Sequence, residues 1–125
     1  TFFHGWIPHQ EVPRALARLD IFVALSRRDS ESYGVAAVEA GAMKLPVVVS
    51  DADGFKEVVL HGRTGFIVPK EDVSVAARHI VELAKRPTFR AALGEAARAH
   101  VQEHHSWSLS LDRMIEAYEF VAVKR

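Results

Sequence analysis

The stretch "DIFVALSRRDSESYGVAAVEAGAMKLPVVVS", residues 20–50, decides the fold. Its first apolar run, residues 21–25, is rich in β-forming side chains, and the second, residues 45–50, has the same character. Short continuous apolar runs of this kind are typical of strands buried in a parallel sheet. Between them, residues 34–44 are small and aliphatic and read as a helix. The order strand, helix, strand predicts an open parallel sheet covered by helices.

Further apolar runs, bounded by proline and glycine residues, extend this order of strands and helices in both directions. Upstream we expect a short strand at 1–7, ended by Pro8, and a helix over 9–20 with Pro13 in its first turn. Downstream we expect a short helix at 55–61, a turn at 62–65, a strand at 65–69, and then only helices, at about 72–86, 88–103 and 108–123. The predicted fold class is α/β, a Rossmann-like open parallel sheet flanked by helices with a helical carboxyl-terminal segment. The domain prediction is a single domain over 1–125, with a strand and helix core at 1–70 and helices at 71–125.

Composition and charge narrow the function. The 125 residues are 49% hydrophobic, enough for a real core, and 16 basic residues cancel 16 acidic ones. This balance gives no reason to expect binding to nucleic acid or to an anionic membrane surface. The chain has no cysteine, which excludes disulfides and thiol metal sites. With no leader sequence recognised, we expect a cytoplasmic protein, and the abrupt start inside a strand pattern suggests a part of a longer one.

A candidate anion site lies where the loop after residues 21–25 becomes a helix. Backbone N–H groups of Gly34, Val35 and Ala36 would point outward there, as at any helix start. Glu39 follows roughly 6–8 Å along the helix axis, where a ribose beside a bound diphosphate would lie. Its carboxylate can accept hydrogen bonds from two vicinal hydroxyls. Glu31, on the loop, could face a further group such as a sugar.

A plainer explanation of the same residues stays open. The small side chains around Glu39 would let this helix approach its neighbours closely. Glu39 could then pair with Arg27, Arg28 or Lys44, and Glu31 would be an exposed loop acid. The sequence also lacks the GxGxxG and GxxxxGK[ST] motifs, which excludes simple dehydrogenase and P-loop readings for this part of the chain.

Residues 20–69 resemble the donor-binding core of the family-4 retaining glycosyltransferases, which have the GT-B fold and use nucleotide-activated sugars. The motif is a Glu, seven residues and a second Glu, with an aromatic-Gly pair between them, here Glu31, Tyr33-Gly34 and Glu39. "LPVVVSDADGFKEVV" and "GRTGFIVP" follow in the family's order, and the similarity extends from "HGWIPHQEVP" to "HSWSLSLDRMIEAYE".

The resemblance implies a role for each matching residue. Glu39 would hold the ribose hydroxyls, and Glu31, as the catalytic residue, would contact the donor sugar and position it. The backbone after Tyr33 would bind the diphosphate. The implied substrate-binding set is Glu31, Ser32, Tyr33, Gly34, Val35, Ala36 and Glu39. Ile7 and Pro8 would lie beside the nucleobase, and Gly54 would form a loop in which Asp53 departs from the family's Gly-Gly pair.

The resemblance also implies what this chain does not carry. An amino-terminal half would supply the acceptor site, and an upstream Arg and Lys would neutralise the leaving diphosphate. The implied partners are therefore a nucleoside-diphosphate sugar and the missing amino-terminal domain, with peripheral membrane association only through that domain. We expect no cofactor and no essential metal, since "DAD" at 51–53 aligns with the family's Gly-rich loop. The isolated chain is expected to be inactive in transfer.

The sequence leaves two other functions open. The chain could be a module that binds a nucleotide or nucleotide sugar without turning it over. A remote alternative is a zinc hydrolase, because "HVQEH" at His100 to His104 matches the HxxEH pattern of inverted zinc peptidases, with Glu116 or Glu119 as a further ligand.

Overall fold

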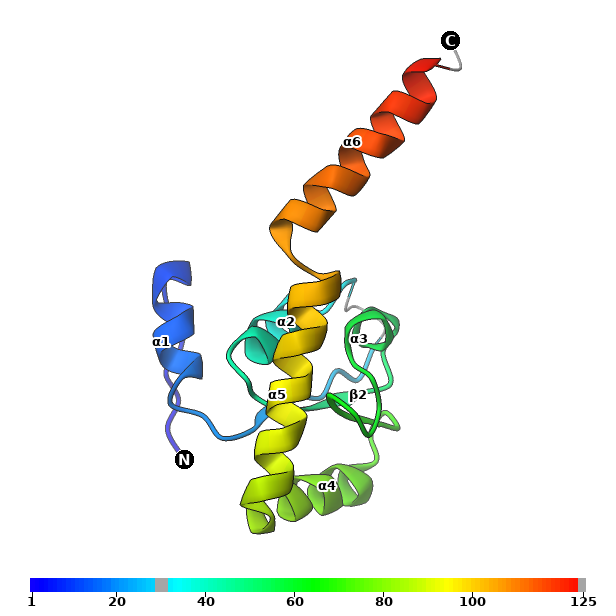
Figure 1. Cartoon of the computed structure of the whole chain (residues 1–125). Coiled ribbons are helices and arrows are strands. Elements are labelled where there is room, and N and C mark those ends of the chain that lie inside the picture. Colours follow the sequence, from blue (N-terminus) through cyan, green and yellow to red (C-terminus); the bar gives the residue numbers. More distant parts are fainter. Residues whose placement is uncertain (29–31, 124–125) are drawn as a thin grey trace.

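The computed structural model describes residues 1–28 and 32–123 of the chain (Figure 1). The elements are, in order, η1 (His9–Glu11), α1 (Val12–Leu16), β1 (Phe22–Ala24), α2 (Val35–Ala42), β2 (Val47–Ser50), α3 (Asp53–Val58), β3 (Gly65–Val68), α4 (Val73–Lys85), α5 (Pro87–His104) and α6 (Trp107–Val123).

The three strands form one parallel sheet in the order β1-β2-β3. Val23 pairs with Val48, and Val48 pairs with Phe66 on the other side. All four residues of β2 are buried, as its continuous apolar run predicts. Gly65 allows β3 to come this close, because a Cβ there would lie 2.3 Å from the Val47 carbonyl oxygen.

Helices cover both faces of this sheet, and the alternation of side chains along β2 divides the core between them. Val47 and Val49 belong to the cluster that includes residues of α2 and α3, whereas Val48 belongs to the cluster that includes residues of α4 and α5. The predicted fold class, an open parallel sheet flanked by helices with a helical carboxyl-terminal segment, is confirmed.

α5 joins the two layers, because it packs against both α2 and α4 (Figure 1). Two glycines permit the close approach to the α2 region. A Cβ on Gly94 would lie 2.1 Å from the carbonyl oxygen of Lys44, just after α2, and one on Gly41 would lie 3.0 Å from Val101 Cγ2. The end of α5 is therefore held at a defined place relative to α2.

The two ends of the chain differ from the sequence prediction. Residues 1–8 form no strand, and their aromatic side chains Phe2, Phe3 and Trp6 are exposed, with Phe3 at 95%. The strand prediction is wrong because a strand needs a neighbour for its backbone hydrogen bonds, and no described strand lies beside this segment. At the other end α6 projects away from the body (Figure 1), and Trp107 at its start is 83% exposed.

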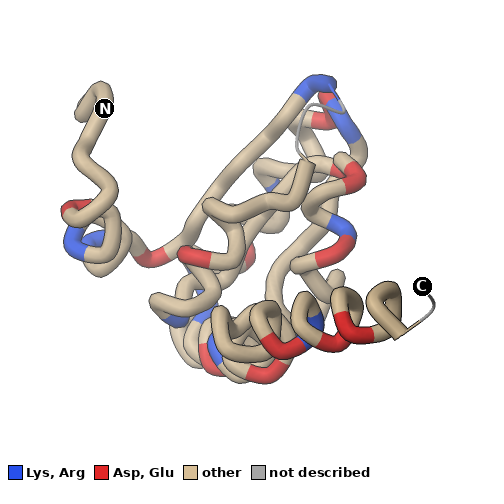
Figure 2. Tube along the Cα trace, turned by 90° about the horizontal axis from the view of Figure 1, so that it is seen from above, with Lys and Arg blue, Asp and Glu red and all other residues tan. Residues whose placement is uncertain are grey.

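Acidic and basic residues are interspersed along the trace (Figure 2). This agrees with the balanced composition, in which 16 residues of each sign cancel. Within the described part of the chain, no helix is long and apolar enough to cross a membrane.

Candidate functional site at the start of α2

The start of α2 lies after β1, at the carboxyl edge of the sheet. Gly34 is its N-cap and has left-handed backbone angles, φ 81° and ψ 38°. Among the described residues no side chain caps this end, and the Gly34 carbonyl accepts bonds from Ala37 N at 2.9 Å and Val38 N at 3.1 Å. The N–H groups of Val35 and Ala36 thus have no acceptor within the helix. Both residues are exposed, so the positive end of the helix faces the surface.

Gly34 is held by the packing of α3. A Cβ at this position would lie 3.0 Å from Phe55 Cδ1 and 3.2 Å from Val58 Cγ2. Gly54, which was predicted on a loop, is instead buried in the first turn of α3, because this helix begins two residues earlier than predicted. Its carbonyl oxygen also lies beside Gly34, at 3.3 Å from the Cβ position. Gly54 therefore packs against Gly34 and supports the start of α2.

Glu39 lies on α2 with its side chain 31% exposed. In the described part of the chain, its one recorded ion-pair contact is with His9, whose Nδ1 lies 3.8 Å from Glu39 Oε1. Arg27 and Lys44, two of the alternative partners, are engaged with other acids, Arg27 with Glu71 at 2.7 Å and Lys44 with Glu95 at 2.8 Å. Those two pairings of Glu39 are absent from the described structure.

The predicted nucleobase side, Ile7 and Pro8, lies on the turn that leads into η1. Since His9 contacts Glu39, this turn is brought to the α2 side of the molecule. Ile7 is half-buried and lines a hollow of about 640 Å³ with residues of α1 such as Val12. The structure thus brings together the turn at 7–9, Glu39 and the start of α2.

Glu31, the predicted catalytic residue, lies outside the described residues. Ser32 and Tyr33 follow it and are exposed. The Tyr33 hydroxyl makes a 2.7 Å hydrogen bond with His105 Nδ1, and the two rings meet edge to face with centroids 5.9 Å apart. Sequence reasoning missed this contact, because 72 residues separate the partners and no local pattern connects them.

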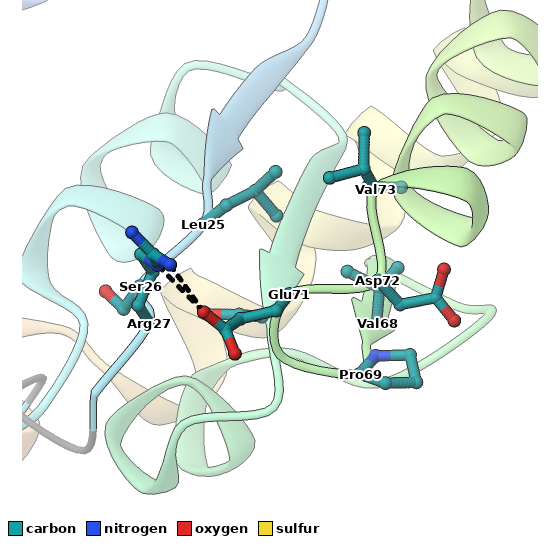
Figure 3. Close-up of a pocket in the computed structure, with 10 residues that line it drawn as sticks. Leu25, Ser26, Arg27, Val68, Pro69, Glu71, Asp72 and Val73 are labelled. Atoms are coloured by element: carbon teal, nitrogen blue, oxygen red, sulfur yellow. Dashed lines mark hydrogen bonds and ion pairs between the residues drawn. The ribbon is translucent and has the colours of Figure 1, made fainter.

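A second feature of the carboxyl edge is a cavity of about 260 Å³ between the strand ends and the start of α4 (Figure 3). Leu25, Val68 and Ala76 are among its walls, and Ser50 is almost fully buried in its lining. Arg27 and Glu71 bond across its mouth. Among the predicted site residues that the structure describes, none lines this cavity. Sequence reasoning missed it, although all of its lining residues follow or end a strand or begin α4.

The "DAD" segment after β2 is held by a lysine. Lys56 Nζ lies 2.9 Å from Asp51 Oδ1 and 3.2 Å from Asp53 Oδ1. The hydrogen bond from Lys56 lowers the pKa of Asp51, and the bonds to Asp51 and Asp53 raise the pKa of Lys56. Asp53, where the family pattern has glycine, is therefore paired within its own segment.

The histidines of the HxxEH string lie at the end of α5. The rings of His100 and His104 are 4.7 Å apart, and His105 lies beside them. Burial, followed by the charges of His104 and His105, lowers the pKa of His100. Across residues 1–28 and 32–123 there is no group of three or more His, Asp or Glu side chains that could hold a metal ion. The zinc hydrolase alternative therefore has no support in the described structure.

Known proteins resemble this chain in sequence and in fold. A GDP-mannose-dependent monoacylated alpha-(1-6)-phosphatidylinositol monomannoside mannosyltransferase of Corynebacterium glutamicum is 34% identical over 117 residues, which cover 90% of this chain and 30% of that protein. Sucrose-phosphate synthase from Thermosynechococcus elongatus has a TM-score of 0.88 at 26% identity, over 99% of this chain and 31% of that one. Anabaena Alr3699/HepE, solved with UDP and glucose, has a TM-score of 0.88 at 24% identity, over 94% and 31%.

These matches have two consequences. The chain spans about a fifth to a third of the length of the curated relatives it matches. The expected resemblance is confirmed, because the model of the family described as glycosyl transferases group 1 matches residues 1–100. This chain belongs to the glycosyl transferases group 1 family.

Proposed function

We propose that the chain is the donor-binding, carboxyl-terminal half of a retaining glycosyltransferase of the GT-B fold. The whole protein would move a hexosyl group from a nucleoside diphosphate to an acceptor hydroxyl, in the cytoplasm. An amino-terminal half would supply the acceptor site. Membership of the glycosyl transferases group 1 family supports the reaction class.

One observation carries the assignment of the donor site. The contact between His9 and Glu39, at 3.8 Å, brings the turn at Ile7 and Pro8 to the helix whose start carries the outward-facing amides. Because Glu39 is five residues after Gly34, about 7.5 Å of helix separates the carboxylate from the amide-rich end. A base, a ribose and a diphosphate follow one another over such distances. The turn at Ile7 and Pro8, Glu39 and the start of α2 follow one another in the same order.

Each residue then has a distinct role toward the donor. Ile7 and Pro8 lie beside the nucleobase, and Glu39 accepts hydrogen bonds from the ribose hydroxyls. The segment from Ser32 through Tyr33 and Gly34 to Val35 and Ala36 binds the diphosphate with its backbone. Glu31 contacts the sugar and positions it, and Gly54 supports the start of the helix.

The helix start also suits the chemical step. As the bond between the anomeric carbon and the diphosphate breaks and a bond to the acceptor oxygen forms, negative charge builds on the departing phosphate. N–H groups fixed at a helix start stabilise this charge without reorganising during the reaction. We expect no essential metal in this step.

The relatives narrow the choice of nucleotide. HepE was solved with UDP, and the Corynebacterium relative is named as GDP-mannose-dependent. Uridine and guanosine diphosphates are therefore the first donors to test, with adenosine diphosphate as the third.

Calorimetric titration of this chain with UDP, GDP and ADP tests the proposal. One nucleotide is expected to bind, and Glu39→Ala should weaken it about tenfold or more, equivalent to about 1.4 kcal/mol. Glu95→Ala is the matched control, because Glu95 is also a helical carboxylate in an ion pair but lies on α5 and pairs with Lys44. Absence of binding at millimolar nucleotide, or equal affinity of Glu39→Ala and wild type, would contradict the donor site.

A binding module without catalysis is the second candidate, and it is favoured for the isolated chain because the chain spans only about a fifth to a third of the length of its relatives. Transfer of a labelled sugar to an acceptor distinguishes the two. The longer protein with both halves should transfer, and the isolated chain should only bind. If the longer protein binds the donor but transfers to no acceptor and does not hydrolyse it, the binding module is the better description.

A further inference from the structure

The contact between Tyr33 and His105 connects the candidate donor site to a part of the chain that has no role in it so far. Tyr33 precedes Gly34 directly, and its hydroxyl lies 2.7 Å from His105 Nδ1. The edge-to-face arrangement of the rings, at 5.9 Å and 73°, adds an aromatic contact to the hydrogen bond. Tyr33 remains 40% exposed, so the ring is held at the surface rather than buried in the core.

His105 is well suited to hold another side chain in place. It is the C-cap of α5, and its backbone N–H donates to the Val101 carbonyl at 2.9 Å. α5 is itself fixed against α2, since a Cβ on Gly41 would lie 3.0 Å from Val101 Cγ2. The second ring nitrogen, Nε2, is buried and has no hydrogen-bond partner among the described residues. The hydrogen bond at Nδ1 is therefore the specific polar contact of this ring.

The position of the Tyr33 side chain affects the backbone at the start of α2. Gly34 has a φ of 81°, and its Cβ position is already crowded by Phe55 on one side. Fixing the side chain of the preceding residue restricts rotation of the peptide unit that joins Tyr33 to Gly34. That unit precedes the exposed N–H groups of Val35 and Ala36. Donors held in one geometry bind an anion with less loss of conformational freedom.

We propose that His105 is a positioning residue for the donor site, which holds the Tyr33 hydroxyl so that the start of α2 is preset for the diphosphate of a nucleotide. The proposal rests on the proposed function and adds a residue that the Glu-x7-Glu motif does not contain. His105 does not touch the donor and acts through Tyr33. Its neighbour His104, which is exposed and makes no recorded bond to Tyr33, has no such role.

A double-mutant cycle tests this with the nucleotide that binds best among UDP, GDP and ADP. Tyr33→Phe and His105→Leu are each expected to weaken binding about three- to tenfold, the range of one hydrogen bond. The double variant should bind no more weakly than the weaker single variant, because both changes remove the same contact. Tyr33→Phe loses only an oxygen at a partly exposed site, so it keeps the test valid if His105→Leu folds poorly.

Two further variants separate positioning from general stability. His105→Asn places an amide near the Nδ1 position and should restore affinity to within about twofold to threefold of wild type. His104→Leu should bind like wild type. His105 is not a positioning residue if Tyr33→Phe and His105→Leu both bind the nucleotide as tightly as wild type does. The same holds if the losses of affinity of the two single variants multiply in the double variant. If wild type binds no nucleotide, the proposed function itself fails.

Discussion

The two sides of the sheet's carboxyl edge offer different environments to an anion. On one side, α2 begins at Gly34 without a side-chain cap in the described structure, and Glu39 makes only a 3.8 Å contact with His9. On the other, the N-cap residue of α4 is Asp72, whose carboxylate accepts a bond from Val75 N at 3.0 Å. The cation there, Arg27, is also bound, to Glu71.

This difference explains why the cavity beside α4 is not the better site for an anion. The cavity beside α4 has a helix start and a cation, but the chain's own carboxylates satisfy both. The start of α2 has weaker internal partners and lies open at the surface. A ligand that carries negative charge gains more from the second arrangement, because it replaces water rather than an existing ion pair.

The largest effect is expected from Gly34→Ala. A side chain at φ 81° costs about 1–2 kcal/mol, and the contact at 3.0 Å with Phe55 adds to it. Gly62→Ala is the matched control, since Gly62 has φ 75° but nothing within 4 Å of the Cβ position. Urea unfolding should show a larger loss for Gly34→Ala than for Gly62→Ala. Equal losses would mean that α3 does not hold the start of α2.

A smaller loss of stability is expected at acid pH, and it should affect the α2 side of the sheet's carboxyl edge. Burial, with the charges of His104 and Arg113, lowers the pKa of His105 against the opposing charge of Glu57, and burial also lowers the pKa of His100. Below the ordinary value of 6.5 the unfolded chain binds protons more readily than the folded one. The stability that these histidines contribute is therefore fully present above that pH, and it is lost as the pH falls toward the pKa values of the two rings in the folded chain.

Urea unfolding at pH 7.5 and 5.5 measures this loss. The variant His100→Leu with His105→Leu should lose less stability between these two pH values than wild type does. Amide exchange should show the loosening around Tyr33 and α5 before α4. A wild-type stability that is unchanged or higher at pH 5.5 would contradict the assigned environment of these rings.

The smallest effect is expected from Arg27→Ala, on the α4 side. Its pair with Glu71 is exposed, with side chains 82% and 61% accessible, so its loss should change the free energy of unfolding by about 0–1 kcal/mol. Nucleotide affinity should change less than about twofold, within the scatter of such titrations. A loss of tenfold or more in affinity would place the donor on the α4 side and reverse the comparison.

Features that depend on residues close together in the sequence could be predicted, whereas features that depend on contacts between distant residues could not. The strand at residues 22–24, α2 and Gly34 follow from local apolar patterns and from the motif around Glu39, and the sequence predicted them. The strand expected at 1–7 failed because pairing depends on a neighbour. The contact between Tyr33 and His105 could not be predicted, because only the packing of α5 on α2 brings these residues together.

The proposed function requires that the donor binds at the start of α2. Nuclear magnetic resonance of the labelled chain, titrated with UDP and GDP, tests it most directly. The largest amide shifts are expected at Val35, Ala36 and Glu39, while Val73 and Ala76 beside the cavity should stay unchanged. Largest shifts at Val73 and Ala76 with α2 unchanged, or no shifts with either nucleotide at millimolar concentration, would contradict it.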